Sequence, residues 1–342
     1  MKLKSLFTSI GAIAIASCFI IGGAQVASAL TVTPPLSELD LTPGETTKTK
    51  IKLYNETDTA VALYSEVVNF GAAGETGTPT YDFGSEKIGL STWIEVTPGP
   101  VHIEPGNSAE VAITINTPAD AEPGGHYAVV FFSENPPSDG SQVVIGTKVG
   151  TLYLADVDGD VTETADIAEF GTVKSSYYRL PVDFFTRFHN TGSVHLRPTG
   201  EIEIKNMFGK VSDTVEVNVT QSATLPGQTR KYEATWEKAM VDSSQTSGIG
   251  GFFQEYKNEL HNFAFGRYTA TVVMTAQATN TAIQKTATTQ FWVIPWHVLL
   301  LDGIVIVVIV LLLIVVIRRY NTWIIQKAGG HTSSDTPAKK IK

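Results

Sequence analysis

The stretch Gly124–Phe132, "GGHYAVVFF", opens with two glycines and continues as a run of β-branched and aromatic residues, which favours a strand. A counterpart, "FGRYTATVV", occupies Phe265–Val273. Both contain Gly-x-Tyr at the start of the strand, and the middle residue is His126 in one copy and Arg267 in the other. Because that position tolerates both residue types, we expect His126 to lie at the surface or the rim, with no chemical role.

Two further landmarks precede each copy of this strand. A strand ends in an asparagine, Asn55 in "IKLYN" and Asn190 in "FFTRFHN". Asparagine accepts left-handed backbone geometry and bonds its own turn, so it suits a corner. A Pro-Gly turn then feeds the next strand, at Pro105 in "EPGNSAEVAITI" and at Pro226 in "LPGQTRKYEATW". The repeated order predicts two similar domains.

The fold class that this pattern predicts is all-β, with two tandem Ig-like β-sandwich domains over 30–160 and 161–295. Short strands separated by Gly, Pro, Asn and Asp clusters are typical of sandwiches. The second domain carries an expected helical insertion at 243–263, where "FFQEYKNELHNF" shows helical spacing of apolar residues. We interpret Tyr127 and Tyr268 as structural tyrosine corners, in which a phenol bonds nearby backbone.

The first residues have the composition of a targeting segment. Lys2 and Lys4 precede a long apolar run, and "VASAL" predicts cleavage after Ala29, so 1–29 is expected to be a signal peptide. The alternative is lipidation of Cys18 in "IASC", against which the apolar run continues past that residue. Cys18 is the only cysteine, so the processed chain would have no disulfide and no thiolate chemistry.

A second membrane signal lies near the C-terminus, where the apolar run "VLLLDGIVIVVIVLLLIVVI" predicts a transmembrane helix at 297–317. Aromatic residues precede it and a positive flank follows it, which predicts membrane-interface roles for Trp292, Trp296, Arg318 and Arg319. We therefore expect a single-pass protein of the cytoplasmic membrane. Its large N-terminal part would be extracellular and its basic tail, 318–342, cytoplasmic.

Asp302 interrupts this apolar run. One interpretation is a functional acid within the membrane. The favoured interpretation is that Asp302 lies close enough to the outer edge for its carboxylate to reach water.

The charge of the chain limits its partners. It has 25 Lys+Arg against 34 Asp+Glu, and several of the cations are in the tail, so the extracellular part is more acidic than the net charge of −9 suggests. Such a surface repels nucleic acid. Neutral glycans, cations and basic proteins remain compatible partners.

The junction between the domains, "DVDGDVTET", has two interpretations. Asp156, Asp158 and Asp160 alternate like the start of a calcium loop, but Val161 stands where that loop needs glycine. Asp158-Gly159 between "TLYLADV" and "VTETADI" instead favours a β-hairpin. The hairpin is the prediction.

Catalytic motifs are missing from the sequence: it has no nucleophile elbow, phosphate loop, dinucleotide fingerprint or zinc helix. His189 and His195 in "HNTGSVH" could face each other on paired strands, with a structural interpretation favoured over a metal site. We therefore predict no enzyme activity, no cofactor and no metal.

A long Gly-rich excursion over Asn69–Val96 is the strongest candidate for function, because such excursions are uncommon and often functional. Tyr81, Phe83 and Trp93 are the predicted ligand-binding residues, since aromatic rings stack on the apolar faces of sugars. Trp93 has an alternative role, namely filling the core at the start of the next strand.

The order of several motifs resembles a known family. "PPLSELDLTPGET", "GETGTP", "LSTWIEV" and "VGTLYLADVDGDV" resemble the peptidoglycan-binding domain of WxL-interacting proteins, most strongly over Pro34–Val161. The second half, followed by "FWVIPW" and the membrane span, occupies the place of that family's second Ig-like domain and anchor. The resemblance implies a bacterial cell-surface protein whose first domain contacts peptidoglycan.

The sequence therefore supports a non-enzymatic, membrane-anchored surface protein that binds peptidoglycan or another surface polymer through its first domain. The alternative is a structural or assembly protein that docks other cell-surface proteins by strand or sandwich contacts, without glycan affinity. A hydrolase or protease accessory is the third and least supported hypothesis.

Overall fold

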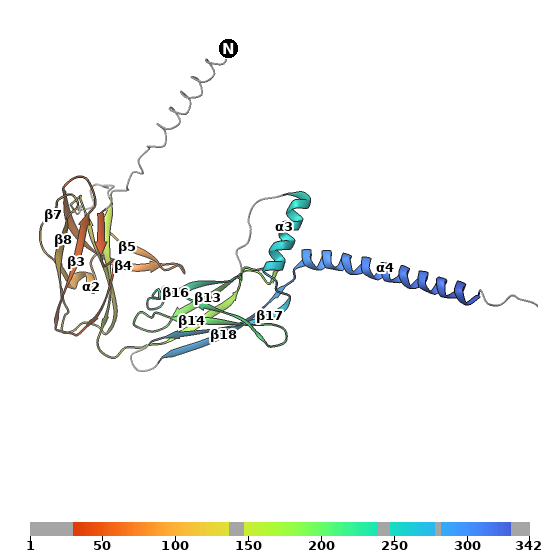
Figure 1. Ribbon diagram of the computed structural model, residues 1–342. Coiled ribbons are helices and arrows are strands. Elements are labelled where there is room, and N and C mark those ends of the chain that lie inside the picture. Colours follow the sequence, from red (N-terminus) through yellow and green to blue (C-terminus); the bar gives the residue numbers. More distant parts are fainter. Residues whose placement is uncertain (1–29, 137–146, 239–246, 278–281, 330–342) are drawn as a thin grey trace, which may run out of the picture. The chain divides into compact units, whose positions relative to one another are not determined.

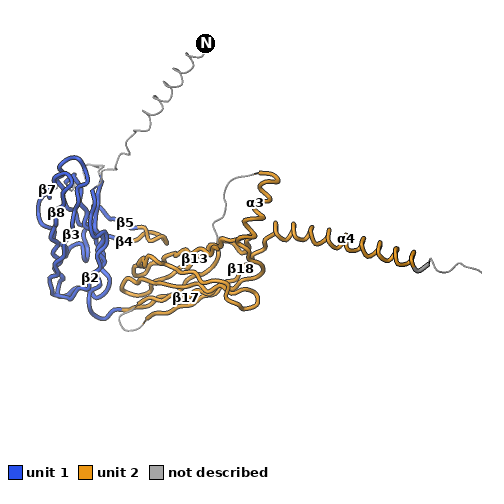
Figure 2. The backbone as a smooth tube through the Cα atoms, in the orientation of Figure 1, with its two compact units in different colours: residues 1–71, 79–161 blue, residues 72–78, 162–342 orange. Residues whose placement is uncertain are grey.

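The computed structural model describes residues 30–136, 147–238, 247–277 and 282–329. The expected signal peptide therefore lies outside the described residues. The chain divides into two compact units, the first comprising residues 1–71 and 79–161 and the second residues 72–78 and 162–342 (Figure 2). The all-β prediction is confirmed, because each unit is a β-sandwich and one long apolar helix follows the second.

The first unit contains the strands β1 to β10 and one helical turn, α2 (Figure 1). Their bounds are β1 (Leu30–Thr33), β2 (Leu36–Leu41), β3 (Thr46–Asn55), β4 (Val61–Ala73), β5 (Thr78–Asp82), α2 (Leu90–Trp93), β6 (Ile94–Val96), β7 (Val101–Ile103), β8 (Ser108–Asn116), β9 (Gly124–Ser133) and β10 (Lys148–Val157).

Two sheets form this first sandwich. One has the order β1-β3-β8-β6, and the other has the order β2-β10-β9-β4-β5 with β7 paired to β4. β10 pairs with β2 in parallel, whereas β1–β3, β3–β8, β6–β8, β9–β10, β4–β9 and β4–β7 are antiparallel. The core between the sheets is formed by every second residue of a strand, for example Ala128, Val130 and Phe132 of β9.

The second unit contains the remaining elements, which are β11 (Ala165–Thr172), β12 (Ser176–Tyr177), β13 (Val182–Asn190), β14 (Thr199–Lys205), β15 (Val211–Val217), β16 (Thr229–Trp236), α3 (Gly248–His261), β17 (Gly266–Ala276), β18 (Ile283–Val293) and α4 (Trp296–Gly329). Its sheets have the orders β11-β13-β16 and β12-β18-β17-β14-β15. Trp236, Phe184, Phe188 and Phe291 fill the core between them.

The two asparagine corners have the same geometry. Asn55 is buried; its Nδ2 donates to the carbonyl oxygens of Thr59 (2.8 Å) and Ile103 (2.9 Å). Asn190 is also buried, and its Nδ2 donates to Val194 O (2.8 Å) and Thr224 O (2.9 Å). In both units one carbonyl belongs to the asparagine's own turn and the other to the segment that enters the Pro-Gly turn.

The predicted hairpin at Asp158-Gly159 is wrong. β10 lies between β9 and β2, so both of its edges are already paired and β11 cannot join it. β11 pairs with β13 in the second unit instead. Asp158 turns back to the end of β2, where its N–H donates to Leu41 O at 2.9 Å. The local Asp-Gly signal is thus overridden by strand pairing.

The two helices of the second unit differ from their predicted extents. α3 (Gly248–His261) lies inside the predicted insertion at 243–263, of which residues 243–246 are outside the described residues. α4 (Trp296–Gly329) continues twelve residues past the predicted end of the span at 317. Its stretch Trp296–Lys327 has a mean hydropathy of 3.5 and is long and apolar enough to cross a membrane.

Candidate functional site

Tyr81 and Phe83 lie together on the outer face of the β2-β10-β9-β4-β5 sheet. The Tyr81 ring meets the Phe131 ring edge-on at a centroid distance of 4.8 Å, and the Phe83 ring stacks on Phe131 at 5.5 Å. Tyr81 is 39% exposed and Phe83 47% exposed, whereas Phe131 is buried beneath them. We name the cluster of Phe70, Tyr81, Phe83, Tyr127 and Phe131 the aromatic face.

The sequence of β9 explains why this cluster forms. β9 is apolar on both faces: Val129 and Phe131 point away from the sandwich core and pack with Val68 of β4. Apolar side chains on the outer face of a sheet need a cover to leave water. The Gly-rich excursion after β4 supplies that cover and thereby brings Tyr81 and Phe83 onto the sheet.

Asn69 holds the end of the excursion in place. Its Nδ2 donates to Glu86 O at 2.8 Å, and its Oδ1 accepts from Ile88 N at 3.1 Å and from Ser91 Oγ at 2.5 Å. Three bonds from one side chain fix the loop that follows Phe83. The loop is therefore ordered by the protein's own contacts, which lowers the conformational entropy lost on binding.

One ion pair borders the aromatic face. Lys148 Nζ lies 2.6 Å from Glu66 Oε2 and 4.3 Å from the centroid of the Phe83 ring. A cation over an aromatic ring is attracted by the ring's negative face. Lys148 therefore positions Phe83 and also places polar groups beside the exposed rings.

A shallow hollow of about 370 Å³ lies next to these residues. Glu66, Asn69, Asp82, Ser85 and Lys87 contribute polar groups to its lining, and Ile94 and Val96 of β6 contribute apolar ones. The lining is therefore mostly polar, and the apolar surface of a ligand site here would come from the aromatic face beside it.

Trp93 lies apart from Tyr81 and Phe83. It is 8% exposed, belongs to the core of the first unit, and its ring centroid is 4.6 Å from that of His126. His126 is half-buried, and its Nε2 lies 2.8 Å from Glu122 O. An external ligand could therefore reach Tyr81 and Phe83 but not Trp93.

The two Gly-x-Tyr tyrosines lie in different places. Tyr268 is in the core of the second unit, and its phenol oxygen accepts from Phe265 N at 3.2 Å. Tyr127 is on the outer face of β9, where its ring packs over Gly125 and near Phe70. A Cβ added to Gly125 would lie 2.0 Å from the Tyr127 hydroxyl, so glycine is needed there.

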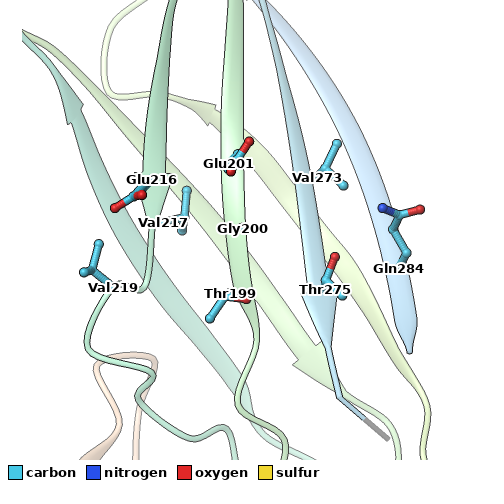
Figure 3. Close-up of a pocket in the computed structure, with 9 residues that line it drawn as sticks. All are labelled: Thr199, Gly200, Glu201, Glu216, Val217, Val219, Val273, Thr275 and Gln284. Atoms are coloured by element: carbon cyan, nitrogen blue, oxygen red, sulfur yellow. The ribbon is translucent and has the colours of Figure 1, made fainter. Parts of the chain in front are cut away.

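The second unit has a hollow of about 450 Å³ on the outer face of its larger sheet (Figure 3). Glu201 of β14 and Glu216 of β15 both border it and are direct cross-strand partners. Like charges that face each other across a sheet repel. This pair has no third acidic or histidine neighbour that would make a metal site, among the residues that the structure describes.

Two metal sites were considered from the sequence as alternatives, and the described residues form a set of metal ligands at neither of them. His189 lies in β13, whereas His195 lies in the loop between β13 and β14, so the two are not on paired strands. Across the described residues, no group of three His, Cys, Asp or Glu is close enough to hold a metal ion, and this includes Asp156, Asp158 and Asp160.

The residues predicted at the membrane interface flank the apolar part of α4. Trp292 of β18 and Trp296 of α4 are exposed. Arg318 and Arg319 lie within α4 and are exposed as well. The helix therefore continues through the positive flank.

Sequence reasoning missed Phe70, Phe131, Lys148 and Glu66 of the site. A signal was present in "HYAVVFF", whose apolar residues fill both strand faces and so require a cover on the outer one. The partners across the sheet could not be read from the sequence, because strand order decides them.

The similarity of this chain to known proteins is a similarity of fold alone. No family model and no curated protein matches the sequence. A class 5 fimbriae chaperone, CfaA, is 11% identical with a TM-score of 0.37 and covers 77% of this chain and 99% of its own. The CsuC–CsuE chaperone–tip subunit complex of Acinetobacter baumannii gives 12% identity, a TM-score of 0.34 and coverages of 75% and 98%.

Proposed function

We propose that the chain is a non-enzymatic, membrane-anchored surface protein whose first unit contacts a glycan through the aromatic face. The observation that carries the proposal is that Tyr81 and Phe83 remain about half exposed while Phe131 fixes them from below. A ring that is both exposed and fixed offers an apolar surface to a sugar ring at little conformational cost.

The polar surroundings of the rings suit the hydroxyl groups of a sugar. Lys148 and Glu66 lie at one side of Phe83, and Asp82, Ser85 and Lys87 line the adjoining hollow. A glycan site needs apolar stacking and a few directional polar groups together. The aromatic face and this hollow provide both.

Peptidoglycan is the polymer that we propose, with another surface polymer as the broader alternative. The resemblance of Pro34–Val161 to the peptidoglycan-binding domain of WxL-interacting proteins supports this choice. The anchor would be α4, with the first unit outside the cell, because Arg318 and Arg319 mark the cytoplasmic side by the positive-inside rule.

The test is sedimentation of the full chain, in detergent, with purified insoluble peptidoglycan. We expect wild type to sediment and a Tyr81→Ala/Phe83→Ala variant to remain in solution, because the variant loses the stacking surface. Phe208→Ala is the matched control, since Phe208 is a strongly exposed ring of the second unit.

Three outcomes distinguish binding through the aromatic face, binding through another surface and the absence of peptidoglycan binding. Loss confined to the double variant supports the aromatic face. Equal sedimentation of all three proteins would keep peptidoglycan binding and discard the aromatic face. If wild type also stays in solution, the peptidoglycan proposal fails.

Protein docking is the second candidate, and the hollow beside β4 favours it. Residues 65–69 of β4 line that hollow together with Ile94 and Val96 of β6, which belongs to the opposite sheet. β6 is the end strand of its sheet, and an edge of this kind is suited to an added strand. A photo-crosslinking residue in place of Ser85 would capture a protein partner in cells if this candidate is right, and would give no protein adduct if the ligand is a glycan.

A further inference from the structure

One face of α3 packs on the first two turns of α4. The ring of Phe252 lies 6.1 Å from that of Trp296 and 5.1 Å from that of His297, measured between centroids. One turn further along α3, the Tyr256 hydroxyl lies 3.5 Å from Asp302 Oδ1. Asp302, the acid that interrupts the apolar run, thus has a partner outside its own helix.

Glu259 fixes this contact. Its side chain is fully buried; Oε1 lies 2.5 Å from His297 Nδ1, and Oε2 accepts from Val298 N at 3.0 Å. The first N–H groups of a helix lack partners within the helix, and a carboxylate is favoured there by the helix dipole. Glu259 therefore acts as a cap that α3 supplies to the N-terminus of α4.

The other side of α3 is held by the sandwich. Glu255 Oε2 accepts from Arg179 Nε at 2.9 Å, and Asn258 is buried. With 100° between successive helix positions, Asn258 lies roughly opposite to Phe253 and Leu260. α3 is thus held on two sides, and its third side is left to solvent.

That third side is an apolar stripe, which we define as Ile249, Phe253 and Leu260. Their exposed fractions are 79%, 48% and 51%. The spacing of four and seven residues places all three on one side of the helix, next to the face that packs on α4. Further exposed apolar side chains surround the junction, namely Phe263, Phe265, Trp292, Ile294 and Trp296.

We propose that α3 lies in the surface of the membrane that α4 crosses, with the apolar stripe inserted between the lipid headgroups. This inference rests on the proposed membrane anchor. A helix in this position has an apolar face rich in Phe, Leu and Ile buried at the headgroup boundary. The occupant is the bilayer because the stripe lies next to the face of α3 that packs on the first turns of α4, and Figure 1 shows α3 beside that start.

The depths of the contacts agree with this placement. Asp302 is six residues after Trp296, which is about 9 Å along the helix axis. An interfacial helix inserts its apolar face about 5–10 Å into the boundary, so the Tyr256 hydroxyl can meet Asp302 just below the headgroups. Glu255 and Glu259 are engaged with Arg179 and with His297.

The experiment uses the full chain with Cys18→Ser, in vesicles of phosphatidylcholine and phosphatidylglycerol. An environment-sensitive fluorophore is attached at Phe253→Cys in the stripe, at Leu312→Cys in the span, or at Phe208→Cys as the exposed control. Lipids brominated near the headgroup quench a fluorophore in the boundary, and aqueous iodide quenches one in water. We expect position 253 to be quenched by the brominated lipid and protected from iodide several-fold relative to position 208.

The three positions distinguish the two proposals. If position 253 is as open to iodide as position 208 while position 312 is protected, the interfacial helix is refuted and the anchor stands. If position 312 is also open to iodide, the anchor itself fails. Protection of position 253 from iodide without quenching by the brominated lipid would mean a protein contact, such as a second copy of the chain, and would also overturn the inference.

Discussion

Replacement of Asn190 by alanine tests the asparagine corner, a structure that occurs once in each unit. Asn190 is fully buried and makes three bonds: two from Nδ2 to Val194 O and Thr224 O, and one accepted by Oδ1 from Gly192 N at 2.9 Å. Alanine removes all three and leaves two carbonyls and one N–H without these partners.

The expected loss follows from the number of bonds. One hydrogen bond contributes about 1 kcal/mol net, so three give a decrease of about 3 kcal/mol in the free energy of unfolding. That is a large part of the roughly 5–15 kcal/mol that stabilises a domain. Asn190→Asp should cost at least as much at neutral pH, because a carboxylate oxygen then faces two carbonyl oxygens. Acidification should recover part of the loss, since a protonated carboxyl donates one bond.

Urea unfolding of the second unit measures this, with fluorescence of the buried Trp236 as one probe and circular dichroism as another. Thr220→Ala is the control within the same unit, because Thr220 is exposed in a turn and shares one surface bond with Ser222 Oγ, so its loss should stay below about 0.5 kcal/mol. A decrease below about 1 kcal/mol for Asn190→Ala would refute the corner as a source of stability.

Two further predictions concern charge and pH. Glu216→Lys should raise the free energy of unfolding by up to about 1 kcal/mol, less at high salt, because it replaces a repulsive partner of Glu201 with an attractive one; a decrease in thermal stability at low salt would contradict this. Burial raises the pKa of Tyr153 and Tyr232, so the folded state favours the neutral phenols. Since unfolded tyrosine has a pKa of about 10, their contribution to stability should be constant below that pH and fall as pH rises above it. A Tyr153→Phe/Tyr232→Phe variant that loses stability above that pH as steeply as wild type does would refute the assignment.

The repeated corners could be predicted from the sequence because their chemistry leaves few alternatives. Asn55 and Asn190 must accept a bond within their own turn and donate two more, which few side chains can do. The Pro-Gly turns and the strand pattern add independent local signals. The sandwich class follows from these features.

The side to which a tyrosine points could be predicted in only one unit. In "RYTATVVMT", the residues that alternate with Tyr268, Ala270, Val272 and Met274 are polar except for Val273, so alternation assigns Tyr268 to the core. In "HYAVVFF" both faces of β9 are apolar, and periodicity cannot assign Tyr127 to either. The same motif therefore leads to a core residue in one unit and to the aromatic face in the other.

Long-range pairing explains what the sequence missed. Asp158-Gly159 is a strong local turn signal, yet the neighbours of β10 come from β2 and β9, which are far away in the chain. The end of α4 shows a similar limit, because hydropathy falls at Arg318 while the helix continues to Gly329. Glu259 of α3 has no sequence signal as a cap, since the helix that it caps begins 37 residues later.

The parallel pairs at the ends of each unit have a consequence for the order in which the chain folds. β2 pairs with β10, and β12 pairs with β18, so each sandwich joins its early strand to its last one. A chain that emerges with its N-terminal end first cannot complete the first sandwich before β10 emerges, nor the second before β18 does. Only Ile294 and Pro295 separate β18 from α4, so the second sandwich closes only when the chain has emerged as far as α4. Until then its core strands lack their partners, and this is the interval in which folding factors and proteases compete for the chain.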